Sequence, residues 1–125
     1  GQPIFPHGLN GIFISRDAVI GKDCVIFHQV TIGSNNLIDS KRKGAPVIGD
    51  AVYIGAGAKI IGKVCIGNNV RIGANCVVFN DVPDNTVVVL NAPRLIEKQN
   101  MDNHFYLKGE DEEWYYFKNG KKVKK

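Results

Sequence analysis

The chain has 125 residues, 44% of them hydrophobic, and a formal net charge of +4; this suits one compact domain plus a tail and excludes a disordered chain. No apolar run approaches the roughly 20 residues that span a bilayer, so we expect a soluble, cytoplasmic protein. Four lysines at the C-terminal end account for the whole excess charge: Lys121, Lys122, Lys124 and Lys125. A solvated tail is the favoured interpretation and a phosphate or membrane-surface contact the alternative, so composition does not point to a nucleic-acid partner.

The first thirteen residues precede any regular pattern. Pro3, Pro6, Gly8 and Gly11 interrupt this segment, and such residues are typical of turns and irregular backbone. The first residue is Gly rather than Met, which suggests a tag remnant or a truncation.

A ladder of aliphatic residues then recurs at intervals of six. Because six is even, every member points to the same side of an extended strand, whereas the 3.6-residue face of an α-helix would drift out of register. Such hexapeptides predict a parallel β-helix, with three repeats in a coil of about 18 residues and coils roughly 4.8 Å apart. The ten members are Ile14, Ile20, Ile26, Ile32, Ile48, Ile54, Ile60, Ile66, Ile72 and Val78.

One long step, residues 34–47, interrupts the ladder and carries the basic run 41–43. We expect an extruded loop here, and long loops in compact domains are usually functional or flexible. If the count resumes in phase at Ile48, the repeats of Ile26, Ile54 and Ile72 share one face. That face stacks three side chains in one column: His28, Ala56 and Ala74.

The three cysteines follow the repeat rather than forming pairs. Cys24 and Cys76 fall at the small inward position, and Cys65 falls at a repeat end. We expect buried or half-buried thiols in a reducing compartment. Their spacing does not resemble a zinc site, and we expect no metal.

After the last repeat, residues 86–90 predict one more strand and residues 94–100 a short helix that caps the open core. Residues 104–107, 113–117 and 121–125 predict short strands, with Asn119-Gly120 as a hairpin turn. The expected organisation is a β-helix domain over 1–93 and a helix and hairpin tail over 94–125. The aromatic run 114–117 is expected to pack on the helix or a neighbouring subunit; a ligand-stacking platform is the alternative.

Beyond the repeats, several segments carry a more specific pattern. They are Pro6-His7-Gly8 before Gly11-Ile12-Phe13-Ile14, the strand Cys24 to Gly33 with His28-Gln29-Val30-Thr31-Ile32-Gly33, and Pro46 to Gly62 with Ile54-Gly55-Ala56-Gly57-Ala58-Lys59. Over Pro3 to about Arg94 the sequence resembles the hexapeptide-repeat acyltransferases, most closely the serine acetyltransferase-like branch that includes sugar and polysaccharide O-acetyltransferases. The resemblance implies a left-handed β-helix, a homotrimer, acetyl-CoA in a groove between subunits, and direct attack of an acceptor hydroxyl on the thioester.

The resemblance also assigns expected roles to residues. His7 matches the family's catalytic histidine, and a histidine suits the removal of a hydroxyl proton. His28 is the second catalytic candidate, with hydrogen bonding to the acceptor, the oxyanion or the pantetheine arm all open; His104 is expected to be structural. Gly33, Ala56 and Ala74 are expected along the pantetheine path, with Lys59 and Arg94 nearer the phosphates. The basic run 41–43 is expected either to reach those phosphates or to be solvated.

The sequence departs from the serine acetyltransferase pattern at three positions. Pro6, Gly44 and Ala45 stand where those enzymes carry the charged groups that hold the amino acid, and unpaired charges in a closed site are costly. We therefore favour a sugar hydroxyl as acceptor. The acidic partner of the histidine would precede Gly1. Either the chain is truncated, or Asp17 or a residue of another subunit replaces that partner, or His7 works without one.

Three functions remain open at this stage. The first is an acetyl-CoA-dependent O-acetyltransferase acting on a sugar or polysaccharide precursor, and the second is the same chemistry on serine. The third is a non-catalytic trimeric β-helix scaffold. A carbonic anhydrase on this fold would need three converging histidines, and the repeats offer only His7 and His28.

Overall fold

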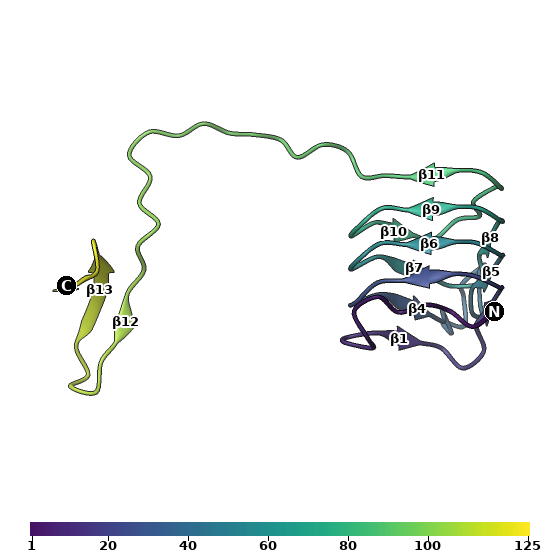
Figure 1. The fold of residues 1–125 in the computed structure, drawn as a ribbon. Coiled ribbons are helices and arrows are strands. Elements are labelled where there is room, and N and C mark those ends of the chain that lie inside the picture. Colours follow the sequence, from purple (N-terminus) through teal and green to yellow (C-terminus); the bar gives the residue numbers. More distant parts are fainter. The chain divides into compact units, whose positions relative to one another are not determined.

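The computed structural model describes residues 1–125, which divide into two compact units, Gly1–Ala92 and Pro93–Lys125. The first unit is a stack of coils (Figure 1) in which successive strands lie parallel. No helix in the chain is long and apolar enough to cross a membrane.

Three parallel sheets form the sides of the coils. One contains β1 (Phe13–Ile14), β4 (Thr31–Gly33), β7 (Lys59–Ile61) and β10 (Val77–Val78). The second contains β3 (Val25–Ile26), β6 (Tyr53–Ile54), β9 (Arg71–Ile72) and β11 (Val87–Val88). The third contains β2 (Val19–Ile20), β5 (Val47–Ile48) and β8 (Cys65–Ile66). The predicted shared face of Ile26, Ile54 and Ile72 is confirmed.

The predicted ladder lines the core. Ile26, Ile32, Ile54, Ile60 and Ile72 are all 0% exposed. Valines four positions after an anchor fill the space between these isoleucines, as Val30 and Val52 do. A single coil would expose its apolar side to water. Stacking of the coils buries that apolar surface and so stabilises the β-helix.

One corner column joins the β3 sheet to the β1 sheet and requires left-handed backbone. Gln29, Gly57 and Asn75 have φ values of 58°, 74° and 62°. Gly and Asn tolerate this region better than most residues. Stacking is continued by hydrogen bonds from Gly57 N to His28 O, at 3.0 Å, and from Asn75 N to Ala56 O, at 2.9 Å. The predicted column of His28, Ala56 and Ala74 lies beside this corner.

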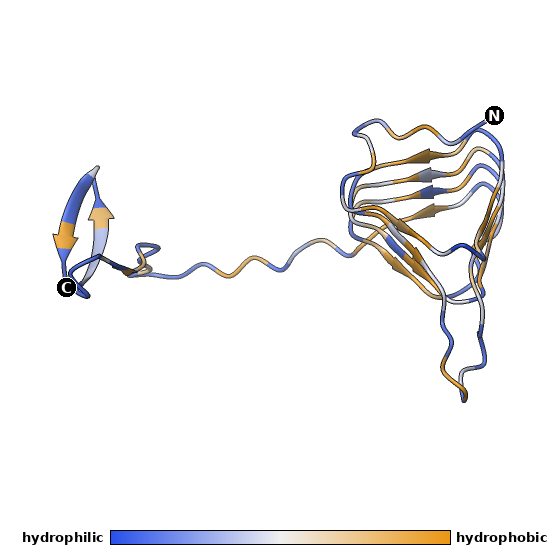
Figure 2. Ribbon diagram, turned by 90° about the horizontal axis from the view of Figure 1, so that it is seen from below, coloured by the Kyte–Doolittle hydropathy of each residue, from blue (hydrophilic) through white to orange (hydrophobic).

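The predicted loop leaves the coils between β4 and β5 (Figure 2). Asn35 and Gly44 close its base with two backbone hydrogen bonds, of 3.0 and 2.9 Å. Arg42 ties the loop to the second coil along through an ion pair of 2.8 Å with Asp81, and Asp81 also accepts a 2.8 Å hydrogen bond from Cys65 N. Val47 belongs to β5, so the loop ends one residue earlier than expected.

Two expectations are wrong. Residues 94–100 form no helix, and every one of them is exposed. A helix of this length is marginal in water unless one face is packed, and no face of this segment is buried. Cys65 is exposed rather than half-buried, because it precedes the inward Ile66 and side chains alternate along a strand. Cys24 and Cys76 are buried as predicted.

The second unit contains a three-stranded antiparallel sheet of β12 (Leu107–Lys108), β13 (Trp114–Lys118) and β14 (Lys121–Lys124). Asn119 and Gly120 have φ values of 52° and 74°, as a type I′ hairpin turn requires. The three predicted strands and their turn are therefore confirmed, with shifted bounds. None of the side chains of this unit is fully buried.

Candidate active site

His7 lies in an enlarged version of the corner that joins the first two sheets. Ile4 pairs in parallel with Val25, and Ile26 N donates to Ile4 O at 2.9 Å. Phe5 therefore occupies the position next to Ile26, and His7 enters the corner beside His28. The chain needs more residues to round this corner than in the next coil, so residues 6–11 form a series of turns, with positive φ at Gly8 and Gly11.

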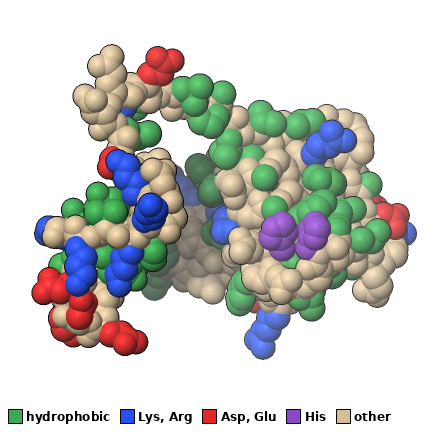
Figure 3. Space-filling model, turned by 60° about the vertical axis from the view of Figure 1, so that its left-hand side comes forward, with side chains coloured by type: hydrophobic (Ala, Val, Ile, Leu, Met, Phe, Trp, Pro, Cys, Tyr) green, Lys and Arg blue, Asp and Glu red, His purple; other side chains and the backbone are tan.

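The two predicted catalytic histidines are in contact. The rings of His7 and His28 have centroids 5.2 Å apart and lie nearly perpendicular, at 84°. Phe27 packs against His7 at 5.7 Å and against Tyr53 at 5.1 Å. The pair is visible as two adjacent histidine side chains on the surface of the helix (Figure 3). Two residues separated by a whole coil of sequence therefore form one site.

Burial differs between the two imidazoles. His7 is exposed, whereas His28 is half-buried and its Nδ1 is buried with no hydrogen-bond partner within the chain. A buried polar atom without a partner is costly and rare in native proteins, and a catalytic role or a partner from outside the chain is one explanation for it. His28 is therefore a polar group poised next to the exposed ring of His7.

No carboxylate of the chain contacts either ring. Asn10 Nδ2 donates to the backbone carbonyl of His7 at 3.1 Å, which fixes the turn rather than the imidazole. Asp17, the candidate replacement for an acidic partner, pairs with Arg16 at 4.0 Å. No group of three or more His, Cys, Asp or Glu side chains is arranged to hold a metal ion.

Three of the residues predicted to contact coenzyme A lie in the column of His28 or at the corner beside it. Ala56 and Ala74 continue the column that starts at His28. Lys59 is held at the same corner, because its Nζ donates to the carbonyls of Gln29 and Gly57, both at 2.8 Å.

The other two residues predicted to contact coenzyme A are Gly33 and Arg94. Gly33 is buried at the far end of β4, paired with Ile61 of β7. Arg94 belongs to the second unit.

The aromatic neighbours of the site were not predicted as site residues. Phe27 follows an inward isoleucine and Tyr53 precedes one, so both side chains lie on the outside of the second sheet. The Arg71 guanidinium lies 6.0 Å from the centre of the Tyr53 ring. The sequence does contain a feature that could have identified them: each is an aromatic residue at an outward position of a hexapeptide, where a small or polar residue would suffice for folding.

Comparison with known proteins shows which family and which enzymes this chain is similar to. Residues 45–80 match the family described as bacterial transferase hexapeptide (six repeats). The serine acetyltransferase of Mycobacterium tuberculosis is 44% identical over 89 residues, which are 71% of this chain and 38% of that protein. The serine acetyltransferase of Helicobacter pylori strain 26695 is 40% identical over 99 residues, or 78% of this chain and 56% of that protein.

Solved structures agree with the sequence comparison. Serine acetyltransferase isoform 3 of Entamoeba histolytica, in complex with cysteine, has a TM-score of 0.65 and 40% identity, covering 78% of this chain and 34% of that one. Soybean serine acetyltransferase complexed with serine has a TM-score of 0.62 and 41% identity, covering 75% and 37%.

The fold and the repeats define the class: the first unit is a left-handed parallel β-helix, as the sequence predicted, and its repeats match those of the hexapeptide transferases. Within that class, the predicted resemblance to serine acetyltransferases is confirmed. The chain spans between about a third and just over half the length of these relatives.

Proposed function

We propose that this chain is an acetyl-CoA-dependent O-acetyltransferase whose active site is the corner formed by His7 and His28. The contact between these two rings, 5.2 Å apart at an enlarged coil corner, is the observation that carries the proposal. In the reaction, the acceptor hydroxyl oxygen attacks the thioester carbonyl. A new C–O bond forms, the C–S bond breaks, and the hydroxyl proton ends on the departing thiolate.

His7 is the general base in this proposal. Its ring is exposed and contacts only the Phe27 and His28 rings among the aromatic side chains, so a nitrogen can accept the hydroxyl proton. His28 positions that ring by packing against it edge-on. Its own polar atoms are suited to hydrogen-bond the acceptor or the developing oxyanion.

Coenzyme A is proposed to lie along the column that continues from His28. Ala56 and Ala74 have small side chains, which allow the amides of a pantetheine arm to approach the strand backbone. Lys59 lies at the same corner, and its Nζ, which donates to two carbonyls, keeps a third N–H donor for a phosphate oxygen. Gly33 and Arg94 remain predictions for the cofactor.

The site is open to solvent on the side of His7, whereas acyl transfer requires that water be excluded from the thioester. We therefore propose a homotrimer in which a second copy of the chain covers the His7 corner. The three cysteines are free, which supports a reducing, cytoplasmic location.

For the acceptor, the relatives support serine better than the sugar that the sequence alone favoured, since both curated proteins and both solved structures described above are named serine acetyltransferases. L-Serine is therefore the first candidate.

A sugar hydroxyl remains the second candidate because of the loop. Gly44 and Ala45 provide no charge for a zwitterion, and Ala45 is buried. Two of the loop cations are already engaged: Arg42 pairs with Asp81, and Lys43 Nζ donates to Ile38 O at 2.9 Å. An amino-acid carboxylate would have to compete with these contacts or find a partner on another subunit.

The test is release of free thiol from acetyl-CoA with L-serine, simple sugars and nucleotide sugars as separate acceptors. Replacement His7→Ala should lower kcat by about 10²–10⁴-fold, the usual contribution of a general base. Arg16→Ala, which changes an exposed side chain elsewhere on the helix, should leave the rate unchanged.

Two results would contradict the proposal. One is full activity in His7→Ala. The other is no thiol release with any acceptor together with no thermal shift from coenzyme A, although a ligand at 100 times its Kd should stabilise by about 2.7 kcal/mol. The second result would leave the trimeric scaffold as the function.

A further inference from the structure

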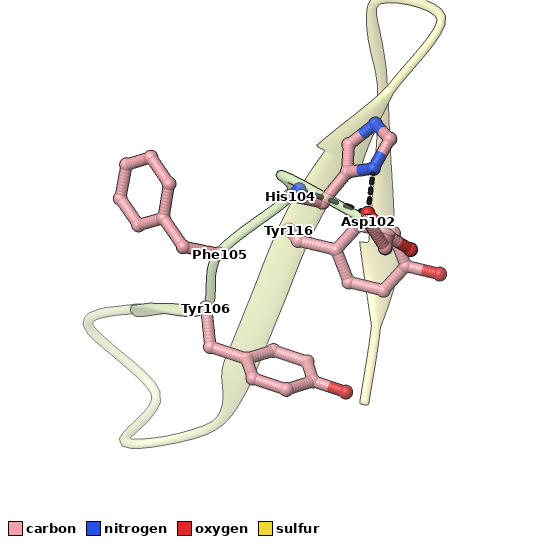
Figure 4. A pocket seen from close by; sticks show the side chains of 5 residues that line it. All are labelled: Asp102, His104, Phe105, Tyr106 and Tyr116. Carbon is pink, nitrogen blue, oxygen red and sulfur yellow. Dashed lines mark hydrogen bonds and ion pairs between the residues drawn. The ribbon is translucent and has the colours of Figure 1, made fainter. Parts of the chain in front are cut away.

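The second unit contains its own pocket, separate in the sequence from the β-helix. Its lining residues are Asp102, His104, Phe105, Tyr106 and Tyr116 (Figure 4). The volume is about 240 Å³, somewhat below the roughly 300–1,000 Å³ typical of pockets for drug-sized ligands. A ligand that enters it is therefore small, or enters with one ring only.

An Asp–His pair is fixed on one side of the pocket. Asp102 Oδ1 accepts a 2.9 Å hydrogen bond from the backbone N of His104 and lies 2.5 Å from its Nδ1. These contacts orient the imidazole and leave its Nε2 for another partner. The hydrogen bond from the His104 backbone, followed by that from its ring, lowers the pKa of the Asp102 carboxyl below its ordinary value, so the group stays ionised at neutral pH.

Aromatic rings form the rest of the wall. Tyr116 is half-buried and packs against His104 and Tyr106, with both centroid distances 5.6 Å. Tyr106 remains 47% exposed. In Figure 4 the hydroxyls of both tyrosines and the Asp102 carboxylate point to one side, while the ring of Phe105 points to the other. One side of the pocket therefore combines a flat apolar surface with several hydrogen-bonding groups.

This combination selects against most ligand classes. A phosphate would meet the Asp102 carboxylate, and a purely apolar ligand would leave the hydroxyls and carboxylate without partners. A cationic ligand would meet Lys118, whose charge acts on Asp102, and Lys125, whose Nζ lies 5.4 Å from the centre of the Tyr106 ring. A neutral ring with many hydroxyls satisfies both the aromatic surface and the hydrogen-bonding groups.

We propose that Asp102, His104, Tyr106 and Tyr116 form a carbohydrate-binding site for a neutral pyranose unit of a saccharide. One face of the sugar stacks on Tyr106 in place of Lys125 Nζ, which now lies over that ring, and its hydroxyls pair with the Asp102 carboxylate, His104 Nε2 and the tyrosine hydroxyls. The site does not depend on the proposed acetyl transfer, and it holds with either acceptor.

The single tryptophan provides a local reporter. Trp114 lies two residues before Tyr116 on β13, so the two side chains share a face of the strand. It is also 45% exposed. A change in its fluorescence therefore reports binding at this unit of the intact chain.

The experiment titrates the full chain with maltohexaose, with the hexamer of N-acetylglucosamine and, as a polyanion, with heparin, while following tryptophan fluorescence. We expect saturable binding of at least one saccharide, with a Kd on the order of 1 mM or tighter. Tyr106→Ala should weaken it by about tenfold or more, and Asp102→Asn by a similar factor, since each removes a contact worth about 1.4 kcal/mol.

Two further variants separate binding from folding. Tyr106→Phe keeps the ring and should lose only a few-fold in affinity, because one hydrogen bond contributes about 1 kcal/mol. Phe117→Ala removes an aromatic ring that is 50% exposed on the opposite face of β13 and should bind as the parent does. Backbone NMR shifts of residues 104–118 establish that each variant keeps the sheet.

Three results would overturn the proposal: no saturable binding of either saccharide, affinity unchanged in both Tyr106→Ala and Asp102→Asn, or binding of heparin alone that salt abolishes. The last would assign the lysines of this unit to a polyanion instead. Because thiol release from acetyl-CoA is measured separately, loss of saccharide binding and failure of the acetyltransferase proposal are distinguishable.

Discussion

The β-helix and the C-terminal sheet are both built from short strands, yet only the β-helix has a core. All 17 buried hydrophobic residues of the chain lie within Gly1–Ala92, and none lies within Pro93–Lys125. A coil turns three sheets toward one interior, so each added coil buries both its own anchors and those of its neighbour. Both faces of a single-layer sheet are exposed to solvent, and they become buried only when another layer or a ligand packs against them. Strand pairing therefore specifies the local structure of both regions, but only in the β-helix does it also bury a core that stabilises the fold.

The largest effect expected from this difference is on amide exchange. The amides of Tyr53, Gly55 and Lys59 donate to the next coil within the packed helix, so they should exchange only on global opening. Those of Leu107 and Lys108 lie in an exposed edge strand. Hydrogen exchange followed by mass spectrometry should show a difference of at least about 10³-fold, since opening free energies range from near zero to the global value. Equal protection of both units would break the comparison.

A cavity in the β-helix should be the most costly single substitution. Ile54 is 0% exposed, and Ile54→Ala should reduce the free energy of unfolding by about 2–5 kcal/mol. The matched control is Val87→Ala on the outside of β11, where the side chain is 58% exposed and the change should be within about 0.5 kcal/mol. Chemical denaturation measures both, and a smaller loss at Ile54 than at Val87 would contradict the assignment of the core.

Close backbone stacking predicts a smaller effect at Gly55. A Cβ there would lie 2.8 Å from Ala74 N and 3.0 Å from the Gly73 carbonyl carbon, both backbone atoms. Gly55→Ala should therefore destabilise by about 1–3 kcal/mol through overpacking. At Gly33 the nearest atom is the flexible end of Ile61, at 3.2 Å, so Gly33→Ala should be close to neutral. Thermal melts of the two variants compare the coil corner with the strand end.

The smallest effect should come from the ion pair that holds the loop. The backbone N–H of Cys65, and then the Arg42 guanidinium, lower the pKa of the Asp81 carboxyl. A lowered folded-state pKa stabilises the protein above the unfolded aspartate value of about 3.9, and this stability is lost as the pH falls through the folded-state value.

Asp81→Asn should accordingly lower Tm slightly at neutral pH, and the difference from the parent should shrink in acid. The pair is exposed, so the shift should be smaller than that of Gly55→Ala. Melting curves at several pH values test it, and a difference that grows in acid would have the wrong sign.

The sequence was most informative where a single local rule repeats. The spacing of Ile48, Ile54 and Ile60 was sufficient to predict that the strands are parallel, which residues form the core and which repeats share a face. Side chains alternate along a strand, so a period of six puts every one of these isoleucines on the inward side. Asn119-Gly120 likewise determined its turn, because both positions need positive φ. The segment 94–100 could not be predicted in this way, since a short helix depends on a packing partner that local sequence does not reveal.

The candidate site likewise has one part that the sequence predicts and one part that only the structure shows. The sequence by itself determined that His28, Ala56 and Ala74 form a column, since the repeat fixes their register, and it singled out His7 by resemblance. Only the tertiary structure decided that His7 reaches the ring of His28, because the pairing of Ile4 with Val25 closes a corner of irregular length. It alone also joined Asp102, His104 and Tyr116, which come together because an antiparallel sheet brings distant segments side by side.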